Sequence, residues 1–105
     1  MTAAVLLVFA SPVDAASEDA WLDWYRSVHI PEIRAAIPEV TQVDQYRLLR
    51  PEAELTRFAT RYEASGIDAS TLADKLGAAA PSLTQTELMA GGDDAPVLEF
   101  ADALA

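Results

Sequence analysis

The sequence predicts an α+β domain, in which two helices cover one face of a four-stranded antiparallel sheet. The length of 105 residues is that of one domain, so residues 1–105 are treated as a single unit. Along the chain, strand-like and helical periodicity follow one another in the order βαββαβ. Hydrophobic residues make up 51% of the chain, which is enough for a core between a sheet and a helical layer.

An apolar run and a capping sequence predict the first strand and the first helix. Ala3–Ala10 is rich in Val, Leu and Phe and is typical of a strand buried on both faces. Ser17 is a suitable N-cap, and the acidic residues after it favour a helix from about Glu18. One face of this helix is aromatic and carries Trp21 and Tyr25.

The same apolar run superficially resembles the core of a secretory signal peptide. A signal peptide begins with a positively charged region, whereas the first basic residue of this chain is Arg26. We therefore interpret the run as the first strand and expect a cytoplasmic protein. No run reaches the ~18 apolar residues that a membrane span needs, so we expect no membrane partner.

A proline interrupts the first helical pattern shortly after the histidine of the chain. Pro31 removes one backbone donor and disfavours the α conformation at Ile30. We therefore expect a kink or a break near His29, followed by a second short helix over Pro31–Ala36 that begins where proline is tolerated.

The second half of the chain supplies the remaining elements. They are strands at residues 40–49, 56–64 and 83–90, a helix between Asp68 or Ser70 and Pro81, and an apolar C-terminal tail at residues 92–105. The order is that of the split βαβ, ferredoxin-like arrangement. Its two helices cover one face of the sheet and leave the other bare, which favours a two-fold dimer with sheet against sheet. The tail is expected to dock, for example on the partner subunit.

Charge and composition exclude several classes of function. Seventeen acidic and seven basic residues give a net charge of −10, and the basic residues are dispersed. Nucleic-acid binding needs a concentrated positive patch, so no nucleic-acid partner is expected, and anionic membrane surfaces are disfavoured for the same reason. The chain has no cysteine and one histidine, which excludes thiolate chemistry and leaves no obvious metal site.

Several short stretches resemble one family. They are the strand exit Phe9–Pro12, Trp24–Tyr25 followed by His29–Glu32, and Pro38–Val40 leading to Tyr46–Leu48. Together they resemble the EthD-like branch of the dimeric α/β-barrel superfamily, and the pattern WY…HIPE…P…V…YR is their specific part. Glu39 stands where that family has a glycine, so the turn there is expected to differ.

The resemblance implies a ferredoxin-like monomer and a homodimer whose two sheets form a barrel. Relatives in this superfamily include cofactor-free monooxygenases, polyketide cyclases, isomerases, decarboxylases, dehydratases and haem-degrading enzymes. Several of them use a histidine in a cavity between the sheet and the helices. Fold analogy alone does not choose among these activities.

The candidate site centres on His29, whose side chain is suited to giving and taking a proton near neutral pH. The candidate substrate-binding residues are aromatic: Trp21, Trp24, Tyr25, Tyr46 and Tyr62. Each also has an alternative role in packing, and His29 could instead bond to a backbone carbonyl freed by Pro31.

The leading hypothesis is a small, homodimeric, cofactor-free enzyme that acts on a hydrophobic aromatic or polyketide-like molecule. A cyclase, dehydratase or monooxygenase would fit, with His29 as the acid or base. The alternative is a non-catalytic dimer that binds a ligand or serves as an accessory protein, with a filled interior beside His29. A third, weaker hypothesis is haem binding.

Overall fold

The computed structural model describes residues 2–104, so Met1 and Ala105, the ends of the predicted domain and tail, lie outside the described residues. The elements in chain order are β1 (Ala3–Ala10), η1 (Ala15–Ser17), α1 (Glu18–Trp24), η2 (Tyr25–His29), α2 (Ile30–Ala36), β2 (Val40–Arg47), β3 (Phe58–Ser65), α3 (Ala69–Ala79), η3 (Ala80–Ser82), η4 (Gly92–Asp94) and β4 (Val97–Asp102).

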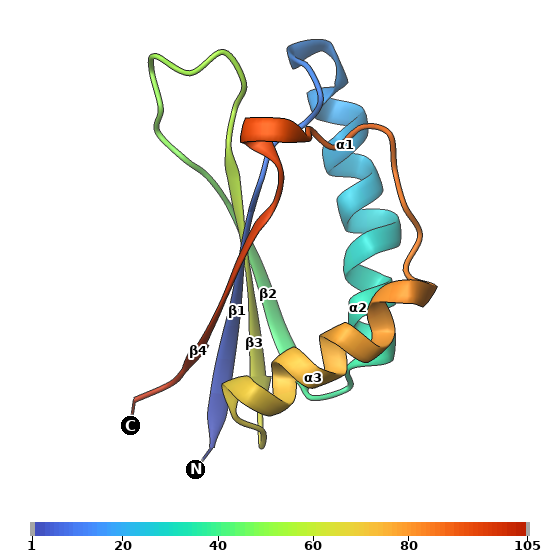
Figure 1. Ribbon diagram of the computed structural model, residues 1–105, viewed down its shortest axis with the longest axis vertical. Helices are drawn as coiled ribbons and strands as arrows, with labels where there is room; N and C mark the ends of the chain where they lie inside the picture. Colours follow the sequence, from blue (N-terminus) through green and yellow to red (C-terminus); the bar gives the residue numbers. More distant parts are fainter. Residues whose placement is uncertain (1, 105) are drawn as a thin grey trace.

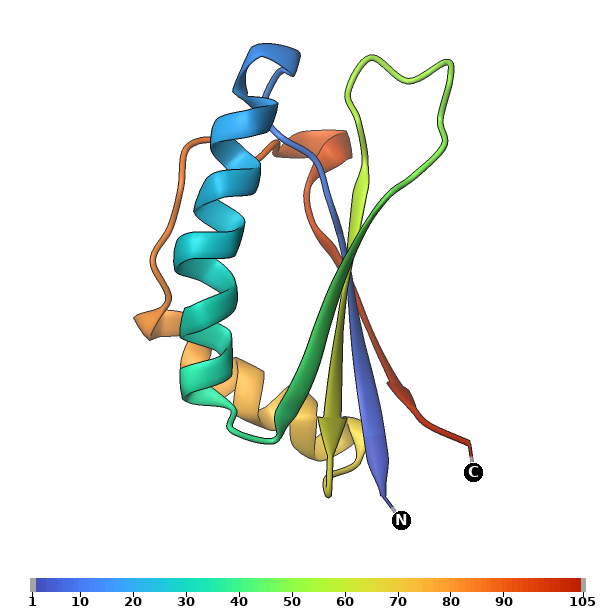
Figure 2. The same cartoon turned by 180° about the vertical axis from the view of Figure 1, so that it is seen from behind.

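The predicted ferredoxin-like α+β fold is confirmed. The four strands form one sheet in the order β2-β3-β1-β4, and each neighbouring pair is antiparallel. Figures 1 and 2 show the helices gathered on one side of this sheet, while the other side carries no helix. The long rod from α1 to α2 and the helix α3 therefore form a second layer, and the core lies between the two layers.

The fourth strand is not where the sequence pattern placed it. Residues 83–90 form no strand, apart from a single bridge between Pro12 and Met89. The strand is instead β4, inside the predicted tail, where Phe100 stands opposite Leu6 and Leu98 opposite Val8. The tail thus completes the sheet of its own chain instead of reaching for a partner.

The first helix continues through Pro31 instead of breaking. Ile30 keeps α-helical dihedral angles, φ −60° and ψ −46°, and its N–H reaches back five residues to the carbonyl of Tyr25. The turn η2 is therefore a π-helix, and Figure 1 shows α1, η2 and α2 as one continuous rod. The predicted disturbance lies at the expected place, but it takes the form of a widened turn, a feature often found at functional sites.

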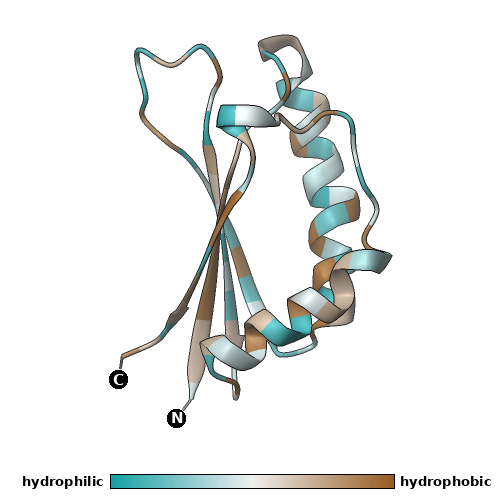
Figure 3. Cartoon of the chain, viewed as in Figure 1, coloured by the Kyte–Doolittle hydropathy of each residue, from teal (hydrophilic) through white to brown (hydrophobic). Residues whose placement is uncertain are grey.

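Burial along β1 alternates, so the expectation of a strand buried on both faces is wrong for the single chain. Ala4, Leu6 and Val8 face the helices and are buried, whereas Leu7 and Phe9 on the opposite face are half-exposed. Figure 3 shows hydrophobic residues along β1 and β3, the two central strands of the sheet. The outer face of the sheet thus carries apolar side chains that no element of the described chain covers.

Two side chains set the helix starts. Ser17 stands at the N-cap position of α1, which begins at Glu18 as predicted, but its side chain makes no capping hydrogen bond. Asp14 caps the preceding turn η1, where its carboxylate accepts a hydrogen bond from the N–H of Ser17 at 2.8 Å. Asp68 caps α3 in the same way through the N–H of Thr71 at 2.8 Å. Of the two caps proposed for this second helix, Asp68 is therefore the one used.

Candidate functional site

A hollow lies between the sheet and the first helix, and it consists of two adjoining chambers. The inner chamber has a volume of about 200 Å³ and is lined by Leu6, Val8, Tyr25, His29, Ile33, Tyr62, Leu76, Ala80, Leu83, Met89, Pro96 and Leu98. The outer chamber has a volume of about 300 Å³ and is lined by Trp24, His29, Ala80, Leu83, Thr84, Gln85, Thr86, Met89 and Pro96. His29 belongs to both walls, so its ring lies where the two chambers meet.

The π-helical turn determines how the rings around His29 are arranged. The imidazole stacks on the indole of Trp24, with centroids 5.0 Å apart and planes inclined by 24°. In a regular α-helix two residues five positions apart lie about 140° apart around the axis, so their rings could not stack. The i→i+5 bonding of η2 removes this separation. Tyr25 meets the imidazole edge-on, with centroids 4.9 Å apart.

Burial keeps the His29 ring neutral near pH 7. It lowers the pKa of His29 from its ordinary value of 6.5, and the negative charge of Glu32 offsets part of that shift. The Nδ1 atom is buried and has no hydrogen-bond partner within residues 2–104. No side chain there fixes the tautomer, so the ring can present either a proton or a lone pair to a molecule in the hollow.

Two tyrosines of the inner chamber are also held in their neutral form. Burial raises the pKa of Tyr25 and of Tyr62 above 10, and the nearby Tyr25 contributes to the rise at Tyr62. The hydroxyl of Tyr62 is buried beside that of Tyr25, but it makes no well-formed hydrogen bond in the described part of the chain. A buried hydroxyl without a partner costs free energy, so this group is available to a ligand oxygen.

The connection between α3 and β4, residues 83–96, covers the hollow, and we call it the covering segment. Figures 1 and 2 show it running back alongside the first helix. One end is tied to α2, where the carboxylate of Glu32 accepts hydrogen bonds from the N–H and the hydroxyl of Thr84, at 2.9 and 2.8 Å. These bonds lower the pKa of Glu32 below its ordinary value.

A buried arginine ties down the other end of the covering segment. Arg57, only 7% exposed, donates hydrogen bonds to the carbonyls of Asp94 at 2.7 Å and Ala95 at 3.0 Å, and to the Ser11 hydroxyl at 3.3 Å. These contacts fix the backbone immediately before Pro96, which lines both chambers. In the middle, the N–H of Ala90 donates to the Ser11 carbonyl at 2.9 Å.

The structure brings four of the six predicted site residues to the hollow. His29, Tyr25 and Tyr62 line the inner chamber, and Trp24 lines the outer one. Trp21 lines neither: it is fully buried in the core between Tyr25 and Phe58, with ring centroids 5.2 and 5.1 Å away.

Tyr46 also lies outside the hollow, and the reason is an irregularity in β2. The register between β2 and β3 shifts between Val40 and Gln42. Because side chains alternate along a strand, this bulge reverses which residues face the helices. Val43 consequently points to the core, and Tyr46 lies on the outer face with 51% of its surface exposed.

The residues of the covering segment were not predicted as part of the site. Thr84, Met89 and Pro96 lie there, where the sequence pattern predicts a strand and a loop. In the sequence, Glu32 stands out only as part of the HIPE pattern. Glu32 lies one turn after His29, on the side of the helix that meets the covering segment. This spacing is the sequence feature that could have identified Glu32 as part of the site.

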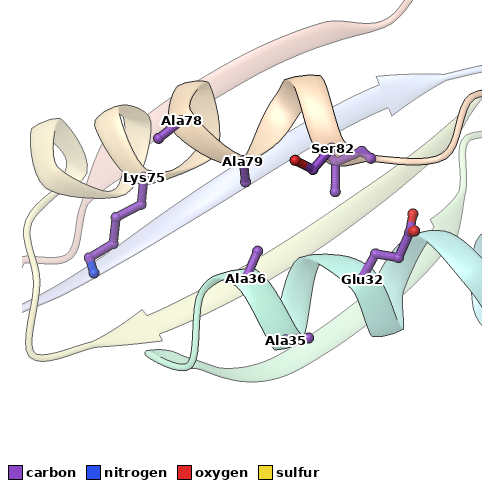
Figure 4. Close-up of a pocket in the computed structure, with 8 residues that line it drawn as sticks. Glu32, Ala35, Ala36, Lys75, Ala78, Ala79 and Ser82 are labelled. Carbon is purple, nitrogen blue, oxygen red and sulfur yellow. The ribbon is translucent and has the colours of Figure 1, made fainter.

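A second and larger hollow is an open groove between α2 and α3, with a volume of about 600 Å³. Figure 4 shows Ala36 and Ala79 pointing toward each other across it, with Lys75 and Glu32 further along. Lys75 already pairs with Glu39 at 3.2 Å. The groove carries no buried polar group without a partner among the side chains that line it, and it is separate from the chambers at His29.

Neither a cluster of metal ligands nor a membrane-spanning helix is found in residues 2–104. Among these residues no three His, Asp or Glu side chains come together as metal ligands would. In the same part of the chain no helix is both long enough and apolar enough to cross a membrane.

Comparison with known proteins identifies the fold. No protein-family model matches the chain, and no match was found among curated proteins. A solved structure, described as a dimeric ferredoxin-like protein from an uncultured marine organism, superimposes with a TM-score of 0.50 at 13% identity. That alignment covers 100% of this chain and 96% of the other. At this identity the likeness concerns the fold alone, so the chain is similar to that protein in having a ferredoxin-like fold.

Proposed function

We infer that the protein is a small cofactor-free enzyme that uses His29 for proton transfer on a hydrophobic, aromatic or polyketide-like molecule held in the hollow. The observation that carries this proposal is the position of the imidazole: neutral, half-buried, and on the wall common to both chambers. The WY…HIPE pattern, which resembles the EthD-like family, adds support. Cyclisation, dehydration and cofactor-independent oxygenation all begin with or include such a proton transfer.

The side chains suggest how the work would be divided. Neutral His29 takes a proton from a carbon or oxygen acid of the substrate and returns it at a later step. Tyr62, kept protonated by burial, donates a hydrogen bond to the substrate oxygen on which negative charge develops. The apolar wall excludes water, so these two interactions act in a medium of low polarity.

Proton exchange tests this proposal without knowledge of the natural substrate. The probe is 1-indanone, whose exchange of α-protons with D2O is followed by ¹H NMR. Because a general base contributes about 10²- to 10⁴-fold, the His29→Gln variant should lose nearly all acceleration over buffer. Tyr46→Phe, on the outer face, is the matched aromatic control and should exchange like the unaltered protein. Equal acceleration by the His29 variant would refute the catalytic role.

One observation favours the alternative of a non-catalytic ligand-binding protein. Catalytic histidines are commonly oriented through their second nitrogen, whereas Nδ1 of His29 has no such partner within residues 2–104. The alternative predicts ligand binding without proton exchange. Haem does not fit the inner chamber, because about 200 Å³ is below the range of about 300–1,000 Å³ typical of sites for drug-sized ligands.

The bare face of the sheet supports a homodimer. It carries Leu7, Phe9 and Val97, together with the charged group Asp44, Arg61 and Glu63, in which Arg61 lies 3.0 Å from Glu63 and 3.8 Å from Asp44. The solved structure with the same fold is described as dimeric. Placing two such faces together would bury the apolar residues of both chains.

Sedimentation equilibrium tests the dimer. The unaltered protein should have twice the mass of the chain. Leu7→Glu, which places a charge in the middle of the bare face, should be monomeric, while Leu49→Glu on an exposed loop should remain dimeric. A monomer in the unaltered protein at high concentration would exclude the dimer.

A further inference from the structure

We propose that the two chambers bind an uncharged, two-part molecule. One ring with a short apolar substituent occupies the inner chamber, and a hydrogen-bonding neutral group occupies the outer chamber. The bond between the two parts then lies beside His29. This inference deepens the proposed function and rests on it only for placing reacting atoms at His29.

The size of the inner chamber limits its occupant to one ring. An apolar cavity of about 150 Å³ is known to hold benzene. At about 200 Å³, the inner chamber has room for one ring and a short substituent. A fused three- or four-ring system would have to displace the sheet residues Leu6 and Val8, which are buried and fixed by strand pairing on both sides. The ring part of the ligand is thus smaller than a polycyclic polyketide.

The chemistry of the walls requires a neutral ligand. Neither chamber is lined by a Lys, Arg, Asp or Glu side chain. On the first helix the charge of Glu32 acts on His29, and both oxygens of Glu32 accept hydrogen bonds from Thr84. From the sheet, Arg57 is committed to the Asp94 and Ala95 carbonyls. The remaining titratable group on the walls is His29, which burial keeps uncharged near pH 7. A carboxylate or ammonium on the ligand would therefore be desolvated without a counter-charge, which is strongly unfavourable.

The two chambers differ in polarity, and this difference points to a ligand with two ends. Aliphatic side chains dominate the inner wall, with the Tyr25 and Tyr62 rings. The outer wall has three consecutive polar uncharged residues, Thr84, Gln85 and Thr86, on the covering segment. Each of the three side chains already makes one hydrogen bond within the chain, but the Thr86 O–H is free to donate and the Gln85 side-chain oxygen is free to accept. These two groups suit amides, esters and hydroxyls. An apolar ring alone would leave the outer chamber unused.

Calorimetric titration of four small probes tests the inference. They are 4-ethylphenol as the neutral ring, 4-ethylbenzoate as its anionic counterpart, 2-anthrol as the three-ring compound, and N-(2-hydroxyethyl)-3-phenylpropanamide as the two-part molecule. Because an unpaired charge is desolvated on binding, we expect 4-ethylbenzoate to bind at least about 100-fold more weakly than 4-ethylphenol. The two-part molecule should bind about tenfold more tightly than 4-ethylphenol, and 2-anthrol should not bind.

A pair of matched variants locates the binding. Ala80 lines both chambers, whereas Ala78 lines the groove between α2 and α3, and both are exposed, so enlarging either preserves the core. Ala80→Leu should weaken both neutral probes at least about tenfold by filling space, and Ala78→Leu should leave both unchanged. Thr86→Val should weaken only the two-part molecule.

The outcomes separate this inference from the proposed function. The inference is overturned if 4-ethylbenzoate or 2-anthrol binds as well as 4-ethylphenol, if no neutral probe binds, or if Ala80→Leu has no more effect than Ala78→Leu. Binding in the expected order without proton exchange of 1-indanone leaves the inference standing and removes the enzyme. Exchange of 1-indanone protons that depends on His29, without the expected order of probe binding, leaves the proposed function standing and removes this inference.

Discussion

Replacing Tyr62 by Phe should make the protein more stable and weaken its binding of phenols. The Tyr62 hydroxyl is buried between the sheet and the first helix beside the Tyr25 hydroxyl, and it makes no well-formed hydrogen bond in residues 2–104. Folding therefore exchanges its bonds to water for no more than a weak contact with Tyr25. Phe retains the ring, with its contacts in the core, and deletes only the unsatisfied group.

The expected size of the effect follows from the cost of leaving a hydroxyl unpaired. Such a group costs about 1–3 kcal/mol, and we take the lower end because the inner chamber beside it allows some relaxation. The free energy of unfolding should therefore rise by about 1 kcal/mol, which corresponds to about 4 °C in the melting temperature of a domain this long. Binding of 4-ethylphenol should weaken several-fold, because a donor to its oxygen is lost.

The assay is urea unfolding followed by tryptophan fluorescence, at one fixed protein concentration because dimerisation adds to apparent stability. Tyr46→Phe is the matched control: its hydroxyl lies on a half-exposed side chain, so the unfolding free energy should change by less than about 0.5 kcal/mol. A Tyr62→Phe variant that loses 1 kcal/mol or more would show that the hydroxyl has a structural partner, and the reasoning would fail.

Three further predictions concern charged and titratable groups near the hollow. Arg57→Met should lower the free energy of unfolding by about 3 kcal/mol, because the charge-assisted bonds from a buried guanidinium to two carbonyls are lost. Arg61→Met should cost less than about 1 kcal/mol, and equal urea midpoints for the two variants would contradict this. Glu32→Gln should speed amide hydrogen exchange at Thr84. In the unaltered protein the protection of Thr84 should be lost, as the pH falls, only below about 4.5, because the folded pKa of Glu32 is depressed. Protection that is lost already above pH 4.5 would contradict this. Because the pKa of His29 is lowered in the folded protein, the unfolded state binds more protons just below pH 6.5. The free energy of unfolding should therefore be highest above pH 6.5 and should decline as the pH falls through the folded pKa of His29. The His29→Gln variant should lack this decline, and the same pH dependence in both proteins would count against the prediction.

Local patterns were sufficient for the elements whose partners are close in sequence or whose periodicity is clear. Ala3–Ala10 and the alternation around Tyr62 predicted β1 and the inner face of β3. The choice between residues 83–90 and Val97–Asp102 as the fourth strand could not be made in this way, because both segments mix apolar and polar residues and only one can pair with the free edge of β1. That competition is settled by tertiary contacts: Glu32 holds the start of the first segment against α2, and Arg57 fixes residues 94 and 95, just before β4 begins.

The site was predictable to the extent that it depends on one helix. The aromatic face and Pro31 placed His29 and Tyr25 near a disturbed turn, where the π-helix is found. The prediction that Tyr46 and Trp21 line the hollow is wrong for a different reason in each case. A bulge of one residue reverses the facing of β2 and leaves no sequence mark, and Trp21 lies one turn too early on the helix to reach the chambers.

The single histidine of the chain makes the most direct test of the central claim simple, because its ring gives one resonance that needs no assignment. We propose a pH titration of the His29 Hε1 signal by NMR, with and without 4-ethylphenol. A neutral imidazole on the wall of a ligand-sized hollow predicts a pKa below 6.5 and a signal that shifts when the phenol is added. A pKa at or above 6.5, together with a signal unmoved by saturating phenol, would contradict the account.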